Sequence, residues 1–306
     1  MSTWIGLAAV AAAWSTPAEA GDVEDIVHVI VMAGQSNMVG GASVEDVDPV
    51  LQPWIEEMPA VPYRQWLNGS EHGQDAWDAH LQPRAIHFGP EMAFTHRLAE
   101  ARPNHQIAII KMAQNGTNLG CTWHPDGCGH HLYQMLKNIT LYWIEDLERD
   151  GIEARLAGFV WVQGEADSTA AWAAASYYEN LRDLVETLRI DLHRPELPFV
   201  AVRVHPRDID YAYNPEVRAA MRTLSVEDPW VDSVGISDLA LRDDDIHLAA
   251  DSMVHAGIRA ADSFLAIGCL DTVEEAPDCW GDFDGDEDLG VPDILELLSA
   301  WGPCGP

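Results

Sequence analysis

The sequence predicts an α/β fold in which helices cover both faces of a parallel sheet. The chain has 306 residues, of which 47% are hydrophobic, and this is enough for a sizeable core. Short, continuous apolar runs alternate along the chain with longer amphipathic segments. Continuous apolar strands are typical of a parallel sheet that is buried on both faces, and amphipathic helices are the elements that bury it.

The pattern predicts five strands and five helices. The strands are expected at 26–33, 106–112, 155–162, 197–204 and 231–236. The helices are expected at 90–101, 131–150, 171–192, 215–226 and 248–265. In parallel α/β folds the ligand crevice lies beyond the carboxyl ends of the strands, at a switch point of the strand order. Polar segments at 35–37, 115–117 and 163–167 each follow a predicted strand, so we expect them to meet at one rim.

Residues 42–87 are predicted to be an irregular insertion. The segment is rich in Pro, Trp and Gly and shows no clear period. Its large aromatic residues either line a sugar cleft or pack the long loop onto the domain. They are Trp54, Tyr63, Trp66 and Trp77.

The first twenty residues predict a secretory signal peptide. A short apolar run at 5–14 precedes Ala18-Glu19-Ala20, a small-x-small cleavage site before Gly21. The run is too short to cross a bilayer, and no other segment reaches eighteen apolar residues. We therefore expect an exported protein, extracellular or periplasmic, with no membrane span.

The charge is strongly acidic. Fifty Asp and Glu residues against seventeen Lys and Arg residues give a formal net charge of -33. This balance argues against nucleic acid or an anionic membrane as a partner, because both are bound by basic side chains. It favours solubility and the binding of divalent cations, or else an acidic solvated surface with no specific partner.

The five cysteines fit an oxidising compartment. Cys121 and Cys128 enclose a short loop that a disulfide could close, and Cys279 and Cys304 bracket the acidic tail. Cys269 is then left over, and a Cys269–Cys279 pair is the alternative. Cys128 also lies in a cluster with three histidines that invites a zinc site, although the spacing matches no known one. These histidines are His124, His130 and His131.

Ser36, in "VIVMAGQSNMVG", is the candidate nucleophile. Ser is also a common helix N-cap, so the hypothesis depends on partners elsewhere in the chain. Acyl transfer by a serine needs a base, a group that orients the base, and donors for the oxyanion. In "RDDDIHLAAD", His247 is the candidate base, and Asp244, three residues upstream, can hold one imidazole nitrogen. Asp243 and Asp245 are also available.

Three groups are candidate oxyanion donors. They are the Ser36 amide, the backbone of Gly116 in "AQNGTNL" and the side-chain amide of Gln163 in "WVQGEAD". Gly116 lacks a Cβ, so its backbone can approach a ligand closely. Taken singly, each also fits an ordinary turn or strand end.

Taken together, these motifs resemble the SGNH hydrolase superfamily. The branch that they resemble is the sialate O-acetylesterase-like and acetylxylan esterase group, carbohydrate esterase family 6. The motifs are Gln35-Ser36-Asn37-Met38, "GPE" at 89–91, "NGT" at 115–117, "WVQGEAD" at 161–167 and "DDIH" at 244–247. The resemblance covers roughly residues 25–267.

The resemblance implies a three-layer α/β/α sandwich with a flavodoxin-like, five-stranded parallel sheet. It implies a secreted serine esterase that removes O-acetyl groups from xylan or sialic-acid-type glycans through an acetyl-enzyme, without a cofactor. Ser36 would attack, His247 would be the general base and Asp244 would orient it. The oxyanion hole would be the Ser36 amide, Gly116 and Gln163. The alternatives are a non-catalytic carbohydrate-binding protein on a decayed esterase fold and a short-chain, lipase-like esterase.

The resemblance also implies supporting residues. Glu165 would be a buried hydrogen-bonding residue that braces the site, and Glu91 would support it similarly. Gln35 and Asn37 would shape the turn that carries Ser36. Asn115 departs from the family, which usually has two glycines before the Thr; it either alters the oxyanion loop or adds a donor.

The acidic tail "DFDGDEDLGVPD" predicts a calcium-binding loop. Five aspartates occupy positions 1, 3, 5, 7 and 12 of a calcium-loop pattern. They are Asp282, Asp284, Asp286, Asp288 and Asp293. The tail resembles one half of a dockerin-type repeat, with an EF-hand-like loop and the apolar helix "ILELLSAW", although Glu287 stands where Gly is usual. The alternative is a disordered acidic tail.

The predicted organisation therefore has four parts. A signal peptide at 1–20 precedes an esterase domain at 21–269, a linker at 270–278 and a calcium-binding segment at 279–306. The last segment would bind a scaffold or cell-surface partner, while the esterase domain would bind an acetylated carbohydrate.

Overall fold

The computed structural model of the protein describes residues 26–71, 80–128, 131–206, 211–268 and 270. Its helices and strands belong to the first of two compact units of the chain, residues 1–269. The predicted signal peptide and calcium-binding segment lie outside the described residues, as do Trp77, His130, Cys269, Cys279 and Cys304.

The predicted parallel sheet is confirmed. All five expected strands are present, with ends within two residues of the prediction: β1 (Val27–Gly34), β6 (Gln106–Ala113), β7 (Ala154–Val162), β8 (Phe199–Val202) and β9 (Val231–Val234). They lie in the order β6-β1-β7-β8-β9 and pair in parallel. Counted along the chain this is 2-1-3-4-5, the flavodoxin-like order.

The prediction of a five-stranded sheet with an irregular insertion at 42–87 is wrong, because the insertion adds two strands. β3 (Tyr63–Leu67) pairs in parallel with β6, and β4 (Ser70–Glu71) pairs antiparallel with β3. Arg64 and Gln65 interrupt the apolar run of β3, which concealed it. Arg64 is buried all the same, because it forms an ion pair with Asp146 and lies 5.4 Å from the ring centroid of Trp143.

Tyr63 and Trp66 belong to the core. They are only 3% and 7% exposed, so of the two interpretations of these aromatics, packing holds and a sugar cleft does not. Trp54 is half-buried at η2 (Gln52–Ile55), a short 3₁₀ turn of the insertion; η1 (Val44–Asp46) is another. The strands β2 (Ala42–Ser43) and β5 (His87–Phe88) form a separate antiparallel pair.

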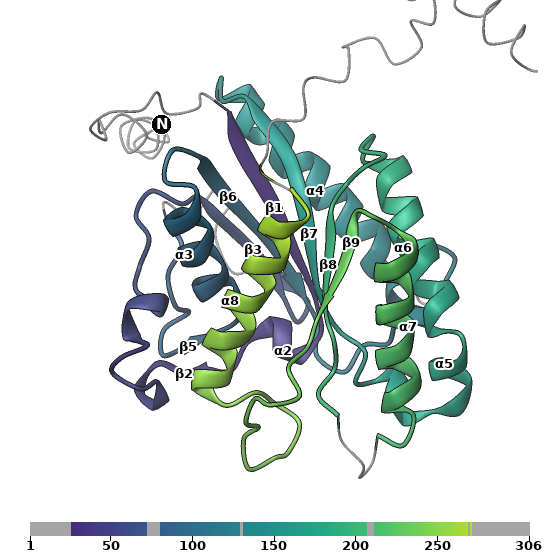
Figure 1. The fold of residues 1–306 in the computed structure, drawn as a ribbon. Helices are drawn as coiled ribbons and strands as arrows, with labels where there is room; N and C mark the ends of the chain where they lie inside the picture. Colours follow the sequence, from purple (N-terminus) through teal and green to yellow (C-terminus); the bar gives the residue numbers. More distant parts are fainter. Residues whose placement is uncertain (1–25, 72–79, 129–130, 207–210, 269, 271–306) are drawn as a thin grey trace, which may run out of the picture. The chain divides into compact units, whose positions relative to one another are not determined.

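Helices cover both faces of the main sheet (Figure 1). α3 (Glu91–Ala101) and α8 (Ala250–Ala266) pack together on one face, with Phe94 and Phe264 edge to face at 5.5 Å. On the other face, α4 (His131–Arg149), α6 (Tyr177–Asp191) and α7 (Asn214–Glu227) contribute to one apolar cluster with the strands. β1 lies between these layers and all eight of its residues are buried.

One predicted helix is interrupted. The segment expected as a single helix at 171–192 is divided into α5 (Ala171–Ala175) and α6. Ser176 stands at the break, and its hydroxyl donates to the carbonyl oxygen of Trp172 at 2.7 Å. A serine side chain that bonds to the backbone in this way competes with helical hydrogen bonding.

A buried ion pair supports the short helix α2 (Ser36–Val39). Lys111, in the middle of β6, places its Nζ 2.6 Å from Glu91 Oε2 and donates to the carbonyl oxygen of Val39 at 3.2 Å. Burial lowers the pKa of Lys111, and Glu91 opposes that shift. Glu91 therefore acts on the end of α2 through Lys111, a residue that the sequence analysis did not single out.

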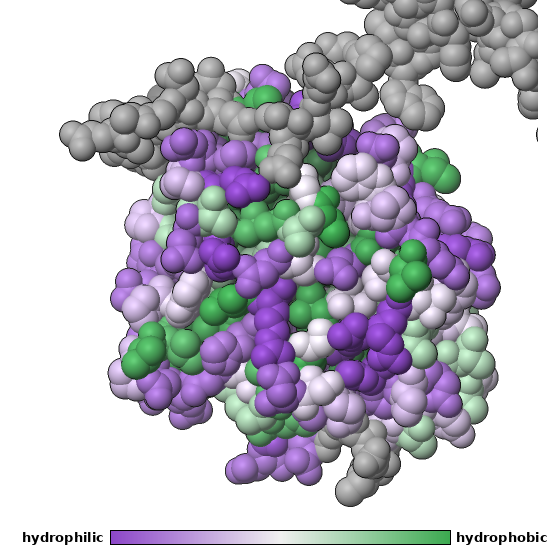
Figure 2. Space-filling view, in the orientation of Figure 1, coloured by the Kyte–Doolittle hydropathy of each residue, from purple (hydrophilic) through white to green (hydrophobic). Residues whose placement is uncertain are grey.

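The surface on the side of α3 and α8 is a mixture of hydrophilic and hydrophobic side chains (Figure 2). Within the described residues, no helix has the length and apolar character needed to cross a bilayer.

Candidate active site

The polar segments predicted to share one rim do so at the ends of three neighbouring strands. The N–H of Gln35 donates to the carbonyl oxygen of Val162 at 2.9 Å, and the N–H of Gln114 donates to that of Gly34 at 3.0 Å. These bonds join the ends of β1, β6 and β7. The sheet order switches direction at β1, which is where a ligand crevice is expected in this topology.

Ser36 is the first residue of α2, directly after the end of β1. A Cβ on Gly34 would lie 2.0 Å from the carbonyl oxygen of Val162, so only glycine allows this tight exit from the strand. The Ser36 side chain is half-buried between the buried Gln35 and Asn37. As the first residue of a helix, Ser36 has no intrahelical acceptor for its N–H, which leaves that donor available.

His247 and Asp244 form the predicted pair. His247 Nδ1 lies 2.8 Å from Asp244 Oδ2, and the N–H groups of Ile246 and His247 both donate to Asp244 Oδ1 at 2.9 Å. The loop closes with a hydrogen bond from Arg242 N–H to the carbonyl oxygen of His247 at 2.8 Å. Of the three neighbouring aspartates, Asp244 is therefore the one that the geometry pairs with the imidazole.

Asp244 is held in its ionised form. Burial alone would raise its pKa, but hydrogen bonds from His247, Ile246 and Arg242 outweigh burial and keep the pKa well below its usual range. Arg242 donates to Asp244 Oδ2 at 3.1 Å and to the carbonyl oxygen of Gly41 at 2.8 Å. It thus joins the loop of His247 to the chain just after α2.

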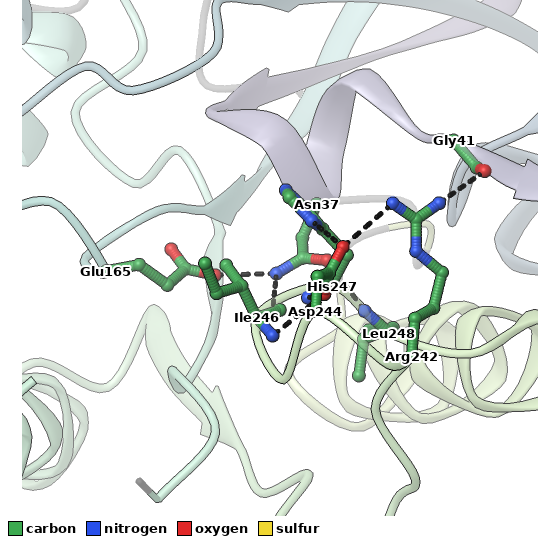
Figure 3. A network of polar contacts seen from close by, with 8 residues as sticks. All are labelled: Asn37, Gly41, Glu165, Arg242, Asp244, Ile246, His247 and Leu248. Carbon is green, nitrogen blue, oxygen red and sulfur yellow. Dashed lines mark hydrogen bonds and ion pairs between the residues drawn. The ribbon is translucent and has the colours of Figure 1, made fainter. Parts of the chain in front are cut away.

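Asn37 connects the turn of Ser36 to the loop of His247 (Figure 3). Its Nδ2 donates to Glu165 Oε1 at 2.7 Å and to the carbonyl oxygen of Ile246 at 3.4 Å. Its Oδ1 accepts the N–H of Leu248 at 3.1 Å. No hydrogen bond joins Ser36 to His247 in the described part of the chain. Such contacts are often long in free enzymes and tighten when substrate binds.

Glu165 holds Asn37 from the other side. Its Oε2 is buried and makes no hydrogen bond to any described residue. Burial raises the pKa of Glu165, while the hydrogen bond from Asn37 and the charge of His247 oppose the shift. The Glu165 carboxyl contacts the Asn37 side chain, and Asn37 in turn bonds to the His247 loop. Glu165 therefore supports that loop through Asn37.

Gly116 lies at an exposed turn with a φ of 65°, in the left-handed region that glycine favours. No atom lies within 4 Å of the position that a Cβ would take. The N–H of its neighbour Asn115 is already occupied, because it donates to Asn68 Oδ1 at 2.9 Å. The predicted disulfide between Cys121 and Cys128 is present a few residues further on, so Cys128 is not free to bind zinc.

Gln163 does not fit its predicted role as an oxyanion donor. It is 0% exposed, and its Nε2 donates to Asp167 Oδ2 at 2.5 Å and to the carbonyl oxygen of Thr117 at 3.0 Å. An amide has two N–H groups. Both are directed at acceptors inside the protein, and none is left for a substrate. Gln35 Oε1 lies close to the same nitrogen, at 3.2 Å.

The family follows from a comparison with known proteins. Residues 26–266 match the family described as "Carbohydrate esterase, sialic acid-specific acetylesterase". This range is most of the chain, so the chain belongs to that family. It is a carbohydrate acetylesterase and hence a carboxylic ester hydrolase.

Individual relatives agree with this assignment. The chain is 27% identical over 255 residues to an Arabidopsis thaliana protein named "probable carbohydrate esterase", covering 79% of this chain and 92% of the relative. An Arabidopsis thaliana crystal structure is similar with a TM-score of 0.63 and 24% identity, over 78% of this chain and 98% of that one. The crystal structure of a carbohydrate acetylesterase from Xanthomonas citri is similar with a TM-score of 0.55 and 17% identity, over 76% of this chain and 54% of that one. The two structures share the fold.

Replacing Asn37 should impair both activity and stability. In Asn37→Ala the bonds to Glu165, Ile246 and Leu248 are lost, so His247 is no longer fixed relative to Ser36. We expect kcat/KM for a small acetyl ester to fall by about 100-fold, the scale of a misplaced catalytic group. The free energy of unfolding should fall by about 1–3 kcal/mol.

The matched control is Asn214→Ala. Asn214 is 2% exposed and donates to the carbonyl oxygen of His205, not to Ser36, Glu165 or the 242–248 loop. It should lose comparable stability in urea unfolding and keep its activity. Equal activity losses in the two variants would contradict a specific link through Asn37.

Asp167 should make stability depend on pH. Burial raises the pKa of Asp167 to about 6, although hydrogen bonds from Gln163 and the Leu119 N–H oppose the shift. The unfolded value is about 3.9, so this group contributes most stability below about pH 4, and the contribution is lost as the pH rises through about 6. The full shift corresponds to about 3 kcal/mol.

Urea unfolding of wild type and Asp167→Asn at pH 4 and pH 7 measures this contribution. The free energy of unfolding of wild type minus that of Asp167→Asn should be lower at pH 7 than at pH 4. Asp238→Asn is the control, because Arg259 lowers the pKa of the exposed Asp238 to about 2 and it should show little change over this range. A pH-independent difference for Asp167→Asn would disprove the expectation.

Proposed function

We propose that this protein is an exported serine esterase that removes acetyl groups from sugar hydroxyls. The observation that carries the proposal is the arrangement around Asn37. That residue follows Ser36 directly, and its side chain holds the loop that carries the His247–Asp244 pair.

In the proposed mechanism Ser36 Oγ attacks the acetyl carbonyl while His247 Nε2 takes its proton. Asp244 stays ionised, holds Nδ1 and stabilises the imidazolium. The N–H groups of Ser36 and Gly116 stabilise the oxyanion. His247 then donates its proton to the sugar oxygen as the acetyl-enzyme forms. A water molecule, deprotonated by His247, attacks the acetyl-enzyme and releases acetate and the free serine.

The proposed substrates are O-acetylated glycans of the sialic acid or xylan type, the second by likeness to carbohydrate esterase family 6. The family description favours the first. A cavity of about 450 Å³ includes Gly41 and Arg242 in its lining, so it lies beside the loops of the site. It is also lined by Asp46, His87 and Asp251, but not by Ser36, Asp244 or His247, so it adjoins the proposed catalytic residues without containing them.

Substitution of the proposed triad tests the mechanism. Ser36→Ala and His247→Ala should each lower kcat for p-nitrophenyl acetate by about 10⁴-fold or more, and Asp244→Asn by about 10⁴-fold. Ser225→Ala, which alters a serine of α7 that donates to the carbonyl oxygen of Arg222 at 2.9 Å and does not line this cavity, should keep wild-type activity. Full activity of Ser36→Ala would refute the mechanism.

Two further assays define the substrate. Hydrolysis should fall steeply from acetate to butyrate and octanoate esters; a preference for butyrate or octanoate over acetate would favour the lipase-like alternative. Acetate release from acetylated sialosides and acetylated xylan distinguishes the two classes of glycan.

The proposal also assigns functions to the two terminal segments, residues 1–20 and 279–306. Export by the signal peptide at 1–20 and a dockerin-type calcium segment at 279–306 remain predictions about residues outside those described. Carboxylates at positions 1, 3, 5 and 12 are ligands that Ca²⁺ prefers, and position 7 normally contributes its backbone carbonyl, so the Asp288 side chain is not required. The segment would dock a scaffold or surface partner.

Calcium titration of the full-length chain tests the segment. Wild type should bind calcium, and the double variant Asp282→Ala/Asp293→Ala should bind at least tenfold more weakly because the first and last positions close the loop. Asp278→Ala, outside the pattern, is the control. Esterase activity should be the same with and without EDTA. Unchanged calcium affinity in the double variant would rule out the proposed loop.

A further inference from the structure

A buried polar cluster lies beneath the loop that carries Gly116. Its members are Gln163 and Tyr177, both 0% exposed, and Asp167, which is 1% exposed. The proposed mechanism gives none of them a contact with the substrate. Their hydrogen bonds nevertheless reach the residues that directly follow Gly116.

Asp167 holds the loop at Leu119. The N–H of Leu119 donates to both carboxylate oxygens of Asp167, at 3.1 and 3.0 Å. The Gly120 N–H also acts on the carboxylate as a hydrogen-bond donor. Leu119 opens η3 (Leu119–Trp123), a single π-helical turn that follows the loop of Gly116.

Gln163 holds the same loop at Thr117, the residue next to Gly116. The Tyr177 hydroxyl lies 3.0 Å from Gln163 Oε1 and 3.1 Å from the Gln163 carbonyl oxygen, so it shares one proton between these two acceptors and favours the amide orientation with Oε1 toward Tyr177. The amide nitrogen therefore faces Asp167 and the carbonyl oxygen of Thr117. Trp123 Nε1 donates to Thr117 Oγ1 at 2.8 Å from the far end of the turn. The loop is thus fixed at several points behind Gly116, which is itself exposed.

We propose that Asp167 is a positioning residue of the oxyanion hole, which holds the 116–120 loop so that the Gly116 N–H meets the developing oxyanion. This inference rests on the proposed function, because it assigns a support to the donor used there. Asp167 acts through Leu119 and Gln163 and does not touch the substrate.

The chemistry of the cluster requires a carboxylate at this position. Donors converge on Asp167 from the loop backbone and from the Gln163 amide. An asparagine offers one acceptor oxygen, and its NH₂ group would face one of these donors. Burial opposes the ionised form and so reduces stability, as the raised pKa of Asp167 indicates. An ionisable group that is kept in a site despite such a penalty is typical of function.

Asp167→Asn in the full-length chain tests the proposal. A lost oxyanion donor lowers kcat by about 10²–10³-fold, and a displaced one should lower it by at least about tenfold. KM for p-nitrophenyl acetate should stay within about threefold, because the N–H acts in the transition state. Affinity for phenylboronic acid, which forms a tetrahedral adduct with a serine, should fall in parallel with kcat.

Ser168→Ala is the matched control. Ser168 is the next residue, is equally buried, and donates to the carbonyl oxygen of Gly164, away from the loop. It should keep kcat and boronic acid affinity. Tyr177→Phe is the second variant, and it decides the outcome if Asp167→Asn does not fold. It removes the bond that orients Gln163 and should lower kcat and boronic acid affinity together.

If Asp167→Asn folds and has the kcat of wild type, the inference is overturned. If only Tyr177→Phe folds, a wild-type kcat in that variant overturns it. A loss of kcat without a loss of boronic acid affinity overturns it as well. The activity of Ser36→Ala in the same assay shows whether only this inference fails or the proposed function fails as well. If Ser36→Ala is inactive while the positioning variants are fully active, only the inference fails; if Ser36→Ala is active, the proposed function fails.

Discussion

The proposed active site depends on the hydrogen bonds of one amide side chain, that of Asn37. Its oxygen accepts the N–H of Leu248, and its nitrogen donates to Glu165 and to the carbonyl oxygen of Ile246. Segments 128 and 211 residues away are thereby held against the turn that carries Ser36. An amide suits this place because it supplies donor and acceptor from one rigid group. The His247–Asp244 pair is formed within its own loop, but its position relative to Ser36 depends on Asn37.

Buried charges support this arrangement from below. Lys111 and Glu91 form an ion pair beneath the end of α2, and Asp167 accepts the Leu119 N–H beneath the loop of Gly116. Burying charge is unfavourable unless partners are well placed, and a buried pair seldom adds net stability over an apolar one. These groups nevertheless hold backbone atoms, the Val39 carbonyl and the Leu119 N–H, that apolar side chains cannot hold. We interpret the cluster around the site as a means of fixing loops at defined positions.

Gln163 lies at the rim of the candidate site, but its side-chain amide is directed into the protein. The family resemblance implied an oxyanion donor, yet the side chain is enclosed and bonded to Asp167 and Thr117. The segment 163–167 lies at the expected rim, so its position could be predicted from the sequence. The direction of its amide could not, because Tyr177 and Asp167 determine it.

The sequence by itself determined the five parallel strands, the turn at Ser36 and the choice of Asp244 as the partner of His247. Continuous apolar runs and a three-residue spacing in a tight turn are local features, and local geometry is sufficient to produce them. Only the tertiary structure decided that β3 joins the sheet, since Arg64 is buried by an ion pair with Asp146, 82 residues away. It alone also decided the role of Asn37 and the supports behind Gly116. Hydrogen bonds and ion pairs between distant segments depend on which side chains folding brings together, and no local pattern contains that information.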